Sequence, residues 1–262
     1  MPYCGNEDGR IYFEESGPAD APVLVLSHSL GSDVSLWDSQ VAVWNDRFRV
    51  VRYDHRGHGR SAAPPFPWSL DDFGRDLLRL LEHLSLDRTH FAGVSLGGMV
   101  GLWLAQNAPE RLNRLVVANT SAWTEDPTLL EGRIRLVESE GTGAIVGDVL
   151  DRWFTPAFHR DRSEVVERFR KGVLATSSES YAATSRAICK LDLREGLSTM
   201  DTPTLVVTGA EDRATPPAWG EAIAGAIPGA RLHELAAAHL SNVESAAEFN
   251  ELVASFLDQE KN

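Results

Sequence analysis

Residues 89–109 read THFAGVSLGGMVGLWLAQNAP, and the rest of the chain is organised around this stretch. A short apolar run, residues 91–94, leads into Ser95, and an apolar segment then runs on to Pro109. Residues 93–97 fit G-x-S-x-G, the pattern of a very sharp turn from a strand into a helix with a serine at its apex. Glycines on both sides of the serine leave room for the strand and the helix to approach each other. The alternative is an ordinary strand–turn–helix joint whose serine only caps the helix.

The length and charge of the chain restrict its class and its partners. With 262 residues it can form one large domain, or one domain with an insertion. The net charge of −13 argues against nucleic acid and against anionic membrane surfaces as partners, because both would repel the protein. An anionic substrate gains no long-range attraction either, so it would need a local basic group.

The cysteines and the first residues indicate a cytoplasmic protein. Cys4 and Cys189 provide no disulfide framework, and we expect two free thiols in a reducing compartment. The opening MPYCGNEDGR lacks the basic and apolar segments of a secretory or lipoprotein signal. No apolar run approaches the ~20 residues that span a bilayer. The sequence leaves the oligomeric state open.

Apolar runs alternate with helical patterns through the first 120 residues. They predict an edge strand or hairpin at residues 10–16, and strands at residues 23–26, 48–53, 91–94 and 112–118. Further strands are expected at residues 204–208 and 231–235, with a helix at 219–226 between them. This alternation is typical of an α/β fold with a largely parallel sheet.

Residues 121–200 show no pattern of a buried strand. They carry helical periodicity at residues 129–137, 144–154, 165–174 and 181–188. We therefore expect a core of residues 1–120 and 201–262, and a helical cap insertion of residues 121–200.

Two capping boxes predict the starts of helices. Ser69 with Asp72 precedes a helical apolar face that begins at Leu70. Ser241 with Glu244 predicts the start of a terminal helix that runs to about residue 257.

A serine nucleophile needs a base and an acid that orients the base, and in a fold of this kind they follow in the order serine, acid, histidine. Only His233 and His239 follow the insertion and the next strand, and His233 lies inside the last predicted strand. His239 lies in the loop after that strand and is our candidate base. The acid should follow residues 204–208, where Asp212 has the expected spacing and Glu211 is the alternative.

The oxyanion of such a reaction needs two backbone N–H donors. Leu96, directly after Ser95, supplies the first. The loop after residues 23–26 should supply the second, and Leu30 is its best candidate. In that loop Ser29 stands where a glycine is more usual, and a small residue still fits.

Two other motifs do not carry their usual chemistry. Residues 57–62, GHGRSA, match the dinucleotide pattern G-x-G-x-x-A, but Pro64 and the proline after it prevent the helix that must follow, so we expect a tight turn. His55 and His58 lie near Asp54, but no further metal ligand follows them in the sequence. We therefore expect no metal.

Taken together, the stretch around Ser95 and residues 54–61, 209–217 and 239–244 resemble the α/β-hydrolase superfamily. Within it the chain is most similar to the 3-oxoadipate enol-lactonases of the β-ketoadipate pathway. The segments that carry this likeness are LSHSLGS at residues 26–32, VRYD at 51–54, RWFTPAF at 152–158 and AHLSN at 238–242.

The resemblance implies a mostly parallel sheet flanked by helices, with the helical cap inserted after the sixth strand. It implies hydrolysis of a small anionic lactone, 3-oxoadipate enol-lactone, through an acyl-enzyme on Ser95 and without a cofactor. The alternatives are a broad carboxylesterase or cofactor-free perhydrolase with the same three residues, and a ligand-binding receptor on the same fold.

The carboxylate of such a substrate needs a cation in the cap, and a guanidinium matches its planar shape. Arg133 is our candidate because it lies early in the cap among apolar residues, and similar lactonases carry an Arg-Ile pair there. Trp153, inside the RWFTPAF segment, is our candidate for an apolar wall of the pocket.

Overall fold

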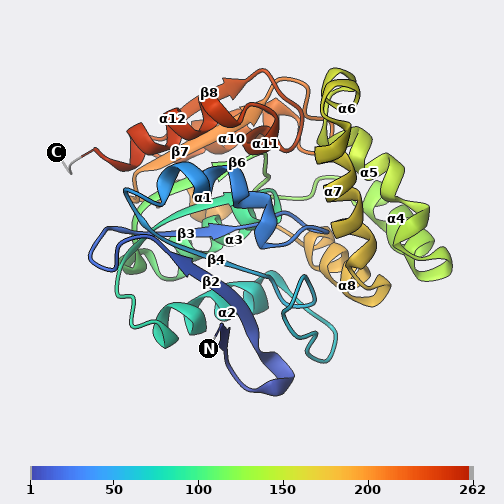
Figure 1. Ribbon diagram of the computed structural model, residues 1–262, viewed down its shortest axis with the longest axis horizontal. Helices are drawn as coiled ribbons and strands as arrows, with labels where there is room; N and C mark the ends of the chain where they lie inside the picture. Colours follow the sequence, from blue (N-terminus) through green and yellow to red (C-terminus); the bar gives the residue numbers. More distant parts are fainter. Residues whose placement is uncertain (1, 260–262) are drawn as a thin grey trace.

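The computed structural model describes residues 2–259, and its centre is an eight-stranded sheet (Figure 1). Along the sheet the strands follow the order β1-β2-β4-β3-β5-β6-β7-β8. Their bounds are β1 Tyr3–Cys4, β2 Ile11–Ser16, β3 Val23–Ser27, β4 Arg49–Tyr53, β5 Thr89–Val94, β6 Leu112–Ala118, β7 Thr204–Gly209 and β8 Arg231–Leu235. The strands from β4 to β8 are parallel, while β2 pairs antiparallel with both β1 and β4.

The continuous apolar runs of the sequence correspond to the central strands. Every residue of β5 and of β7 is buried, because helices cover both faces of the sheet at these strands. The predicted first strand is β2, which forms a hairpin with β1, so β1 and not β2 lies at the edge.

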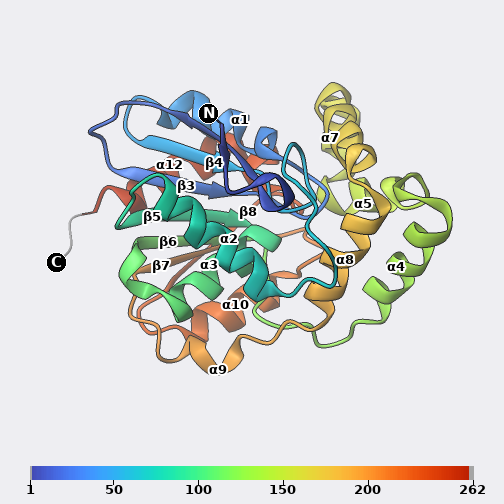
Figure 2. The same ribbon diagram turned by 90° about the horizontal axis from the view of Figure 1, so that it is seen from below.

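Helices cover the two faces of the sheet (Figures 1 and 2). One face carries α2 Leu70–His83, α3 Leu96–Asn107 and α10 Pro217–Ala226, and the other carries α1 Asp38–Trp44 and α12 Ala246–Leu257. On the second face Trp44 stacks on Phe249 with ring centroids 6.3 Å apart. Short 3-10 turns lie at Glu7–Gly9, Val34–Trp37, Pro109–Arg111 and Thr142–Ala144.

The helical cap follows β6, as expected, and gathers at one end of the sheet (Figure 1). The four predicted helical segments correspond to α4 Thr128–Glu140, α5 Val146–Trp153, α7 Ser163–Ala175 and α8 Ser178–Cys189. Two short helices, α6 Pro156–Asp161 and α9 Arg194–Leu197, were not expected. The chain before α9 already contacts the core, since Gln106 Nε2 on α3 donates to the carbonyl of Leu193 at 2.9 Å.

One predicted capping box is confirmed and the other is wrong. At the start of α2, the Asp72 carboxylate accepts the Ser69 N–H at 2.8 Å. By contrast, Ser241–Glu244 forms a separate short helix, α11, and α12 begins only at Ala246. The hydroxyl of Ser241 bonds to Asn119 instead of capping a helix, because the strand ends lie close enough to offer a tertiary partner.

Within residues 2–259, no helix combines the length and the apolar character that crossing a membrane requires.

Candidate active site

Ser95 lies at the apex of the turn between β5 and α3 in a strained backbone conformation. Its φ is 56° and its ψ is −115°, a region that residues other than glycine rarely adopt. A Cβ atom on Gly93 would lie 2.2 Å from the carbonyl oxygen of Gly97, and one on Gly97 would lie 2.1 Å from that of Ser27. Both glycines are therefore required by close backbone approach.

The hydroxyl of Ser95 does not serve as a helix cap. Ser95 is the N-cap of α3 by position, but its side chain makes no capping hydrogen bond. Its backbone is held instead, because Ser95 N donates to the Ala118 carbonyl at 2.9 Å and Ser95 O accepts from the Thr120 hydroxyl at 2.6 Å. The alternative of a plain capping serine therefore does not describe this turn, and the side chain lines a cavity.

Asp212 and His239 form a buried hydrogen-bonded pair at the ends of β7 and β8. His239 Nδ1 lies 2.9 Å from Asp212 Oδ2, and both side chains are almost fully shielded from solvent. The Thr215 hydroxyl also donates to Oδ2 at 2.7 Å, and the N–H groups of Ala214 and Thr215 donate to Oδ1 at 2.8 and 2.9 Å. Glu211 is exposed and takes no part in this network.

The surroundings of Asp212 favour its ionised form. Burial on its own raises the pKa of a carboxyl group, but the charge of His239 and the hydrogen bonds from His239 and Thr215 outweigh it. The pKa of Asp212 therefore lies below its ordinary value. An ionised Asp212 fixes the proton of His239 on Nδ1 and leaves Nε2 free to act as a base.

Asn119 is a residue of this network that the sequence reasoning did not identify. It follows β6 with a positive φ of 47°. Its Nδ2 donates to Asp212 Oδ2 at 3.1 Å and to the Ala238 carbonyl at 3.3 Å. A polar residue directly after a buried parallel strand was the available signal, since such ends meet at one edge of the sheet.

The loop after β3 brings Leu30 to the same cavity as Ser95. His28 braces this loop, because its Nδ1 bonds to the Ser29 carbonyl at 2.8 Å and its Nε2 accepts the His55 N–H at 3.0 Å. Burial and the neighbouring His58 lower the pKa of His28 to about 3, and burial lowers the pKa of His58 to about 4. Both rings are therefore neutral, and they support the loop after β3 from inside the fold.

The segment after β4, which carries the rejected dinucleotide pattern, forms a tight turn. Asp54 Oδ1 accepts the Val34 N–H and Oδ2 accepts the Arg60 N–H, each at 2.8 Å. Burial raises the pKa of Asp54 to about 6. Within residues 2–259, no group of three or more histidine, cysteine or carboxylate side chains is arranged to hold a metal ion.

The candidate residues meet at a cavity of about 130 Å³ between the sheet and the cap. Ser95, His239 and Leu30 line it from the core, and Arg133 and Trp153 line it from the cap. Further lining comes from Ser29, Met99, Ser121, Trp123, Thr124, Asp126, Leu129, Leu130, Val149, Arg152, Tyr181, Ile188, Ala214, Thr215 and Trp219. Every side chain proposed from the sequence, apart from the buried Asp212 and the backbone donor Leu96, thus borders one space.

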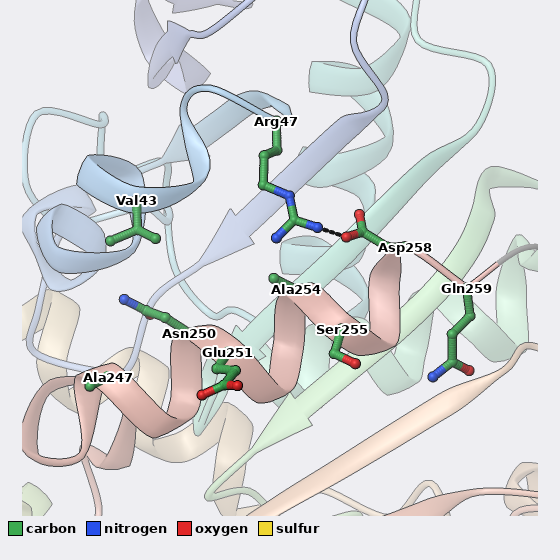
Figure 3. Close-up of a pocket in the computed structure, with 9 residues that line it drawn as sticks. All are labelled: Val43, Arg47, Ala247, Asn250, Glu251, Ala254, Ser255, Asp258 and Gln259. Atoms are coloured by element: carbon green, nitrogen blue, oxygen red, sulfur yellow. Dashed lines mark ion pairs between the residues drawn. The ribbon is translucent and has the colours of Figure 1, made fainter.

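A larger hollow of about 570 Å³ lies between α1 and α12 and is open to solvent (Figure 3). An ion pair between Arg47 and Asp258 crosses it. None of its described lining residues is a histidine or a cysteine. The smaller cavity at Ser95 is therefore the candidate site of reaction, because it alone of the two joins a serine to a buried histidine–carboxylate pair.

Two cap arginines line the cavity and share one carboxylate. Arg133 on α4 is largely buried and pairs through Nη2 with Asp148 on α5. Arg152 Nε lies 3.3 Å from the same carboxylate, and its Nη1 donates to the Arg213 carbonyl at 3.0 Å. Among the residues that the structure describes, Arg133 Nε is buried without a hydrogen-bond partner. Asp126, also in the lining, is exposed and bonds to the start of α4.

The fold and the sharp serine turn define the class of protein. The profile of the alpha/beta hydrolase fold matches residues 22–246, and the chain belongs to this family of hydrolases. Similarity within the family is more specific. The chain is 38% identical over 251 residues to 3-oxoadipate enol-lactonase 2 of Acinetobacter baylyi, covering 96% of this chain and 94% of that protein.

Solved structures agree with this likeness. The enol-lactonase from Burkholderia xenovorans LB400 superposes with a TM-score of 0.96 at 38% identity, and the match covers 98% of this chain and 100% of the lactonase chain. A hydrolase from Pseudomonas aeruginosa PA01 superposes with a TM-score of 0.94 at 43% identity, covering 98% of both chains. The predicted fold class is confirmed.

Proposed function

We propose that the protein hydrolyses 3-oxoadipate enol-lactone to 3-oxoadipate through an acyl-enzyme on Ser95. The observation that carries the proposal is a serine at a strained turn and a buried His239–Asp212 pair, both next to one cavity in a chain similar to enol-lactonases. The reaction is acyl transfer from a small lactone to water.

The proposed mechanism assigns one role to each residue. His239 Nε2 takes the proton of Ser95 as the hydroxyl oxygen attacks the lactone carbonyl, and the buried Asp212 carboxylate stabilises the imidazolium that forms. The N–H groups of Leu96 and Leu30 stabilise the oxyanion. The ring C–O bond then breaks, and the enol that leaves takes the proton and tautomerises to the ketone. A water molecule, deprotonated by His239, releases the acyl chain from Ser95.

We further propose that Arg133 binds the carboxylate arm of the substrate. A largely buried guanidinium that lines the cavity supports this role, since a substrate carboxylate there would gain a charge-assisted hydrogen bond. Arg133 shares Asp148 with Arg152, so two cations face one carboxylate on this wall. Arg152, which the sequence reasoning did not single out, is a second candidate for the same anion.

Trp153 is proposed as an apolar wall of the pocket, and the cap as a cover that forms the pocket and excludes bulk water from it. The Trp153 side chain is 4% exposed and packs edge-on against Phe169, with ring centroids 6.2 Å apart. We propose residues 121–200 as the cap domain and residues 1–120 and 201–262 as the core, in a cytoplasmic enzyme that acts on a small anionic lactone.

Turnover of purified enol-lactone, compared with p-nitrophenyl acetate, tests the proposal directly. A preference for p-nitrophenyl acetate would favour a broad carboxylesterase, and a burst of product without turnover would favour a binding protein. Arg133→Ala should raise KM for the anionic lactone by about 2 kcal/mol, roughly 30-fold, and leave the neutral ester little changed. Arg186→Ala is the matched control, because Arg186 is a cap arginine paired with Glu138 away from the cavity. Equal losses on both substrates would show that Arg133 is structural.

A further inference from the structure

The carboxylate of Glu244 lies between the cap and the turn that carries His239. Its Oε2 accepts the N–H of Ala238 at 3.0 Å, and its Oε1 accepts the hydroxyl of Thr155. The Thr155 N–H points to the same carboxylate, at 3.3 Å from Oε2. Glu244 therefore joins the residue before His239 to the cap segment between α5 and α6.

The residue after His239 is joined to the same cap segment. Leu240 N donates to the carbonyl of Trp153 at 3.1 Å. Both peptide neighbours of His239 are thus bonded, directly or through Glu244, to residues 153–155. Because the side chain of Trp153 lines the cavity, one short cap segment both shapes the pocket and holds the histidine turn.

Two further bonds make this connection stiff. The Thr155 hydroxyl oxygen also accepts the Phe158 N–H at 3.2 Å and so caps α6. This bond leaves the hydroxyl proton of Thr155 for Glu244. On the other side, the Ala238 carbonyl accepts from Asn119, which also donates to Asp212. The Ala238 backbone is therefore held at its nitrogen by Glu244, which also binds the cap, and at its oxygen by the acid network.

We propose that Glu244 is a positioning residue that couples the placement of the cap to the orientation of His239. The inference rests on the proposed hydrolytic chemistry of Ser95 and His239, but not on the choice of lactone. An ionised carboxylate only accepts hydrogen bonds, and the donors of Thr155 and Ala238 approach Glu244 from two sides. Glutamine replaces it only in part, because an amide oxygen on the Ala238 N–H leaves the amide nitrogen facing the Thr155 N–H, which is a donor that nitrogen cannot accept.

The test measures kcat and KM of the full-length protein on p-nitrophenyl acetate, a substrate without a carboxylate. A displacement of about 1 Å in a catalytic group can cost about 100-fold, so Glu244→Ala and Glu244→Gln should lower kcat by about 10- to 100-fold. KM should change by less than about threefold, because the pocket wall remains. Glu248→Gln is the matched control, since Glu248 lies four residues on and pairs with His233 at the exposed surface; its kcat should equal that of the wild type.

Variants of Thr155 separate positioning from a general loss of stability. Thr155→Val should lower kcat and Thr155→Ser should restore it, because serine keeps the hydroxyl. In the double variant Thr155→Val/Glu244→Ala, kcat should be no lower than in Glu244→Ala alone, since both changes break one connection. If Glu244→Ala does not fold, the Thr155 pair decides the question.

Wild-type kcat in folded Glu244→Gln and Thr155→Val would overturn the proposal, as would additive losses in the double variant. Absence of all turnover by the wild type, together with no phosphonylation of Ser95 by a neutral fluorophosphonate, would instead overturn the proposed hydrolytic function. A wild type that cleaves p-nitrophenyl acetate but not the enol-lactone would leave the role of Glu244 intact and change only the substrate.

Discussion

Replacing Gly97 by alanine should disable the active site without adding any polar group to it. Gly97 lies in the first turn of α3, where its Cα faces the end of the central strand β3. A Cβ atom there would lie 2.1 Å from the carbonyl oxygen of Ser27 and 2.6 Å from its carbonyl carbon. The Ser27 backbone cannot give way easily, because β3 is paired with β4 on one side and β5 on the other.

The helix must therefore move, and the proposed mechanism places the nucleophile and an oxyanion donor at its start. Ordinary contact would require α3 to withdraw by roughly 1 Å. This shift would move Ser95 and the N–H of Leu96 away from His239, and a misplacement of about 1 Å can cost about 100-fold in kcat. Overpacking of this kind also lowers the free energy of unfolding by about 1 to 3 kcal/mol.

The assay compares kcat/KM and urea unfolding of Gly97→Ala with those of Gly225→Ala. Gly225 lies on the exposed side of α10, and a Cβ atom added to it would meet no neighbouring atom within 4 Å. Gly225→Ala should keep full activity and gain about 0.5 to 1 kcal/mol, since alanine loses less backbone entropy in a helix. Unaltered activity and stability in Gly97→Ala would refute the reasoning about the close approach of α3 to β3.

Three other changes have defined outcomes. Ser95→Ala should lower kcat by about 10⁴-fold or more in a protein with the wild-type circular dichroism spectrum, and near-normal activity would end the hydrolase mechanism. Asp212→Asn should lower kcat by about 10³- to 10⁴-fold and Glu211→Gln much less, and the reverse ranking would show that the acid is misassigned. Acid should destabilise the fold, because burial lowers the pKa values of His28 and His58 in the folded protein. In the unfolded chain these histidines have the ordinary pKa of about 6.5, so they bind protons below that pH only when the protein unfolds. The free energy of unfolding, from urea titrations, should fall by at least about 2 kcal/mol between pH 7 and pH 5, and a constant or rising value would contradict the neutral state of these rings.

The sequence predicts the central part of this site because its signals are local. The turn at Ser95 needs glycines at fixed offsets, a strand before it and a helix after it, and all three are written within twenty residues. His239 and Asp212 follow from chain order, since the carboxyl ends of parallel strands meet at one edge of the sheet. Their distance of 2.9 Å then depends only on the fold.

Residues whose role depends on tertiary partners could not be assigned in this way. Ser241 and Glu244 have the spacing of a capping box, but the hydroxyl of Ser241 bonds to Asn119 and the carboxylate of Glu244 bonds to the cap. A pattern of two residues does not reveal that a stronger partner lies more than eighty positions away in the chain. Asn119 was passed over for a related reason, because a search for a carboxylate does not detect the amide that supports one.

The same distinction applies to the cap. Helical periodicity reveals α4 and α5, since each buries an apolar face, but it does not reveal that Arg133 and Arg152 converge on Asp148. Their convergence results from packing between helices, which sequence spacing within one helix does not encode. The chemistry of bond cleavage is therefore more readily predicted than substrate choice, because the former depends on local turns and strand order, whereas the latter depends on contacts between cap helices.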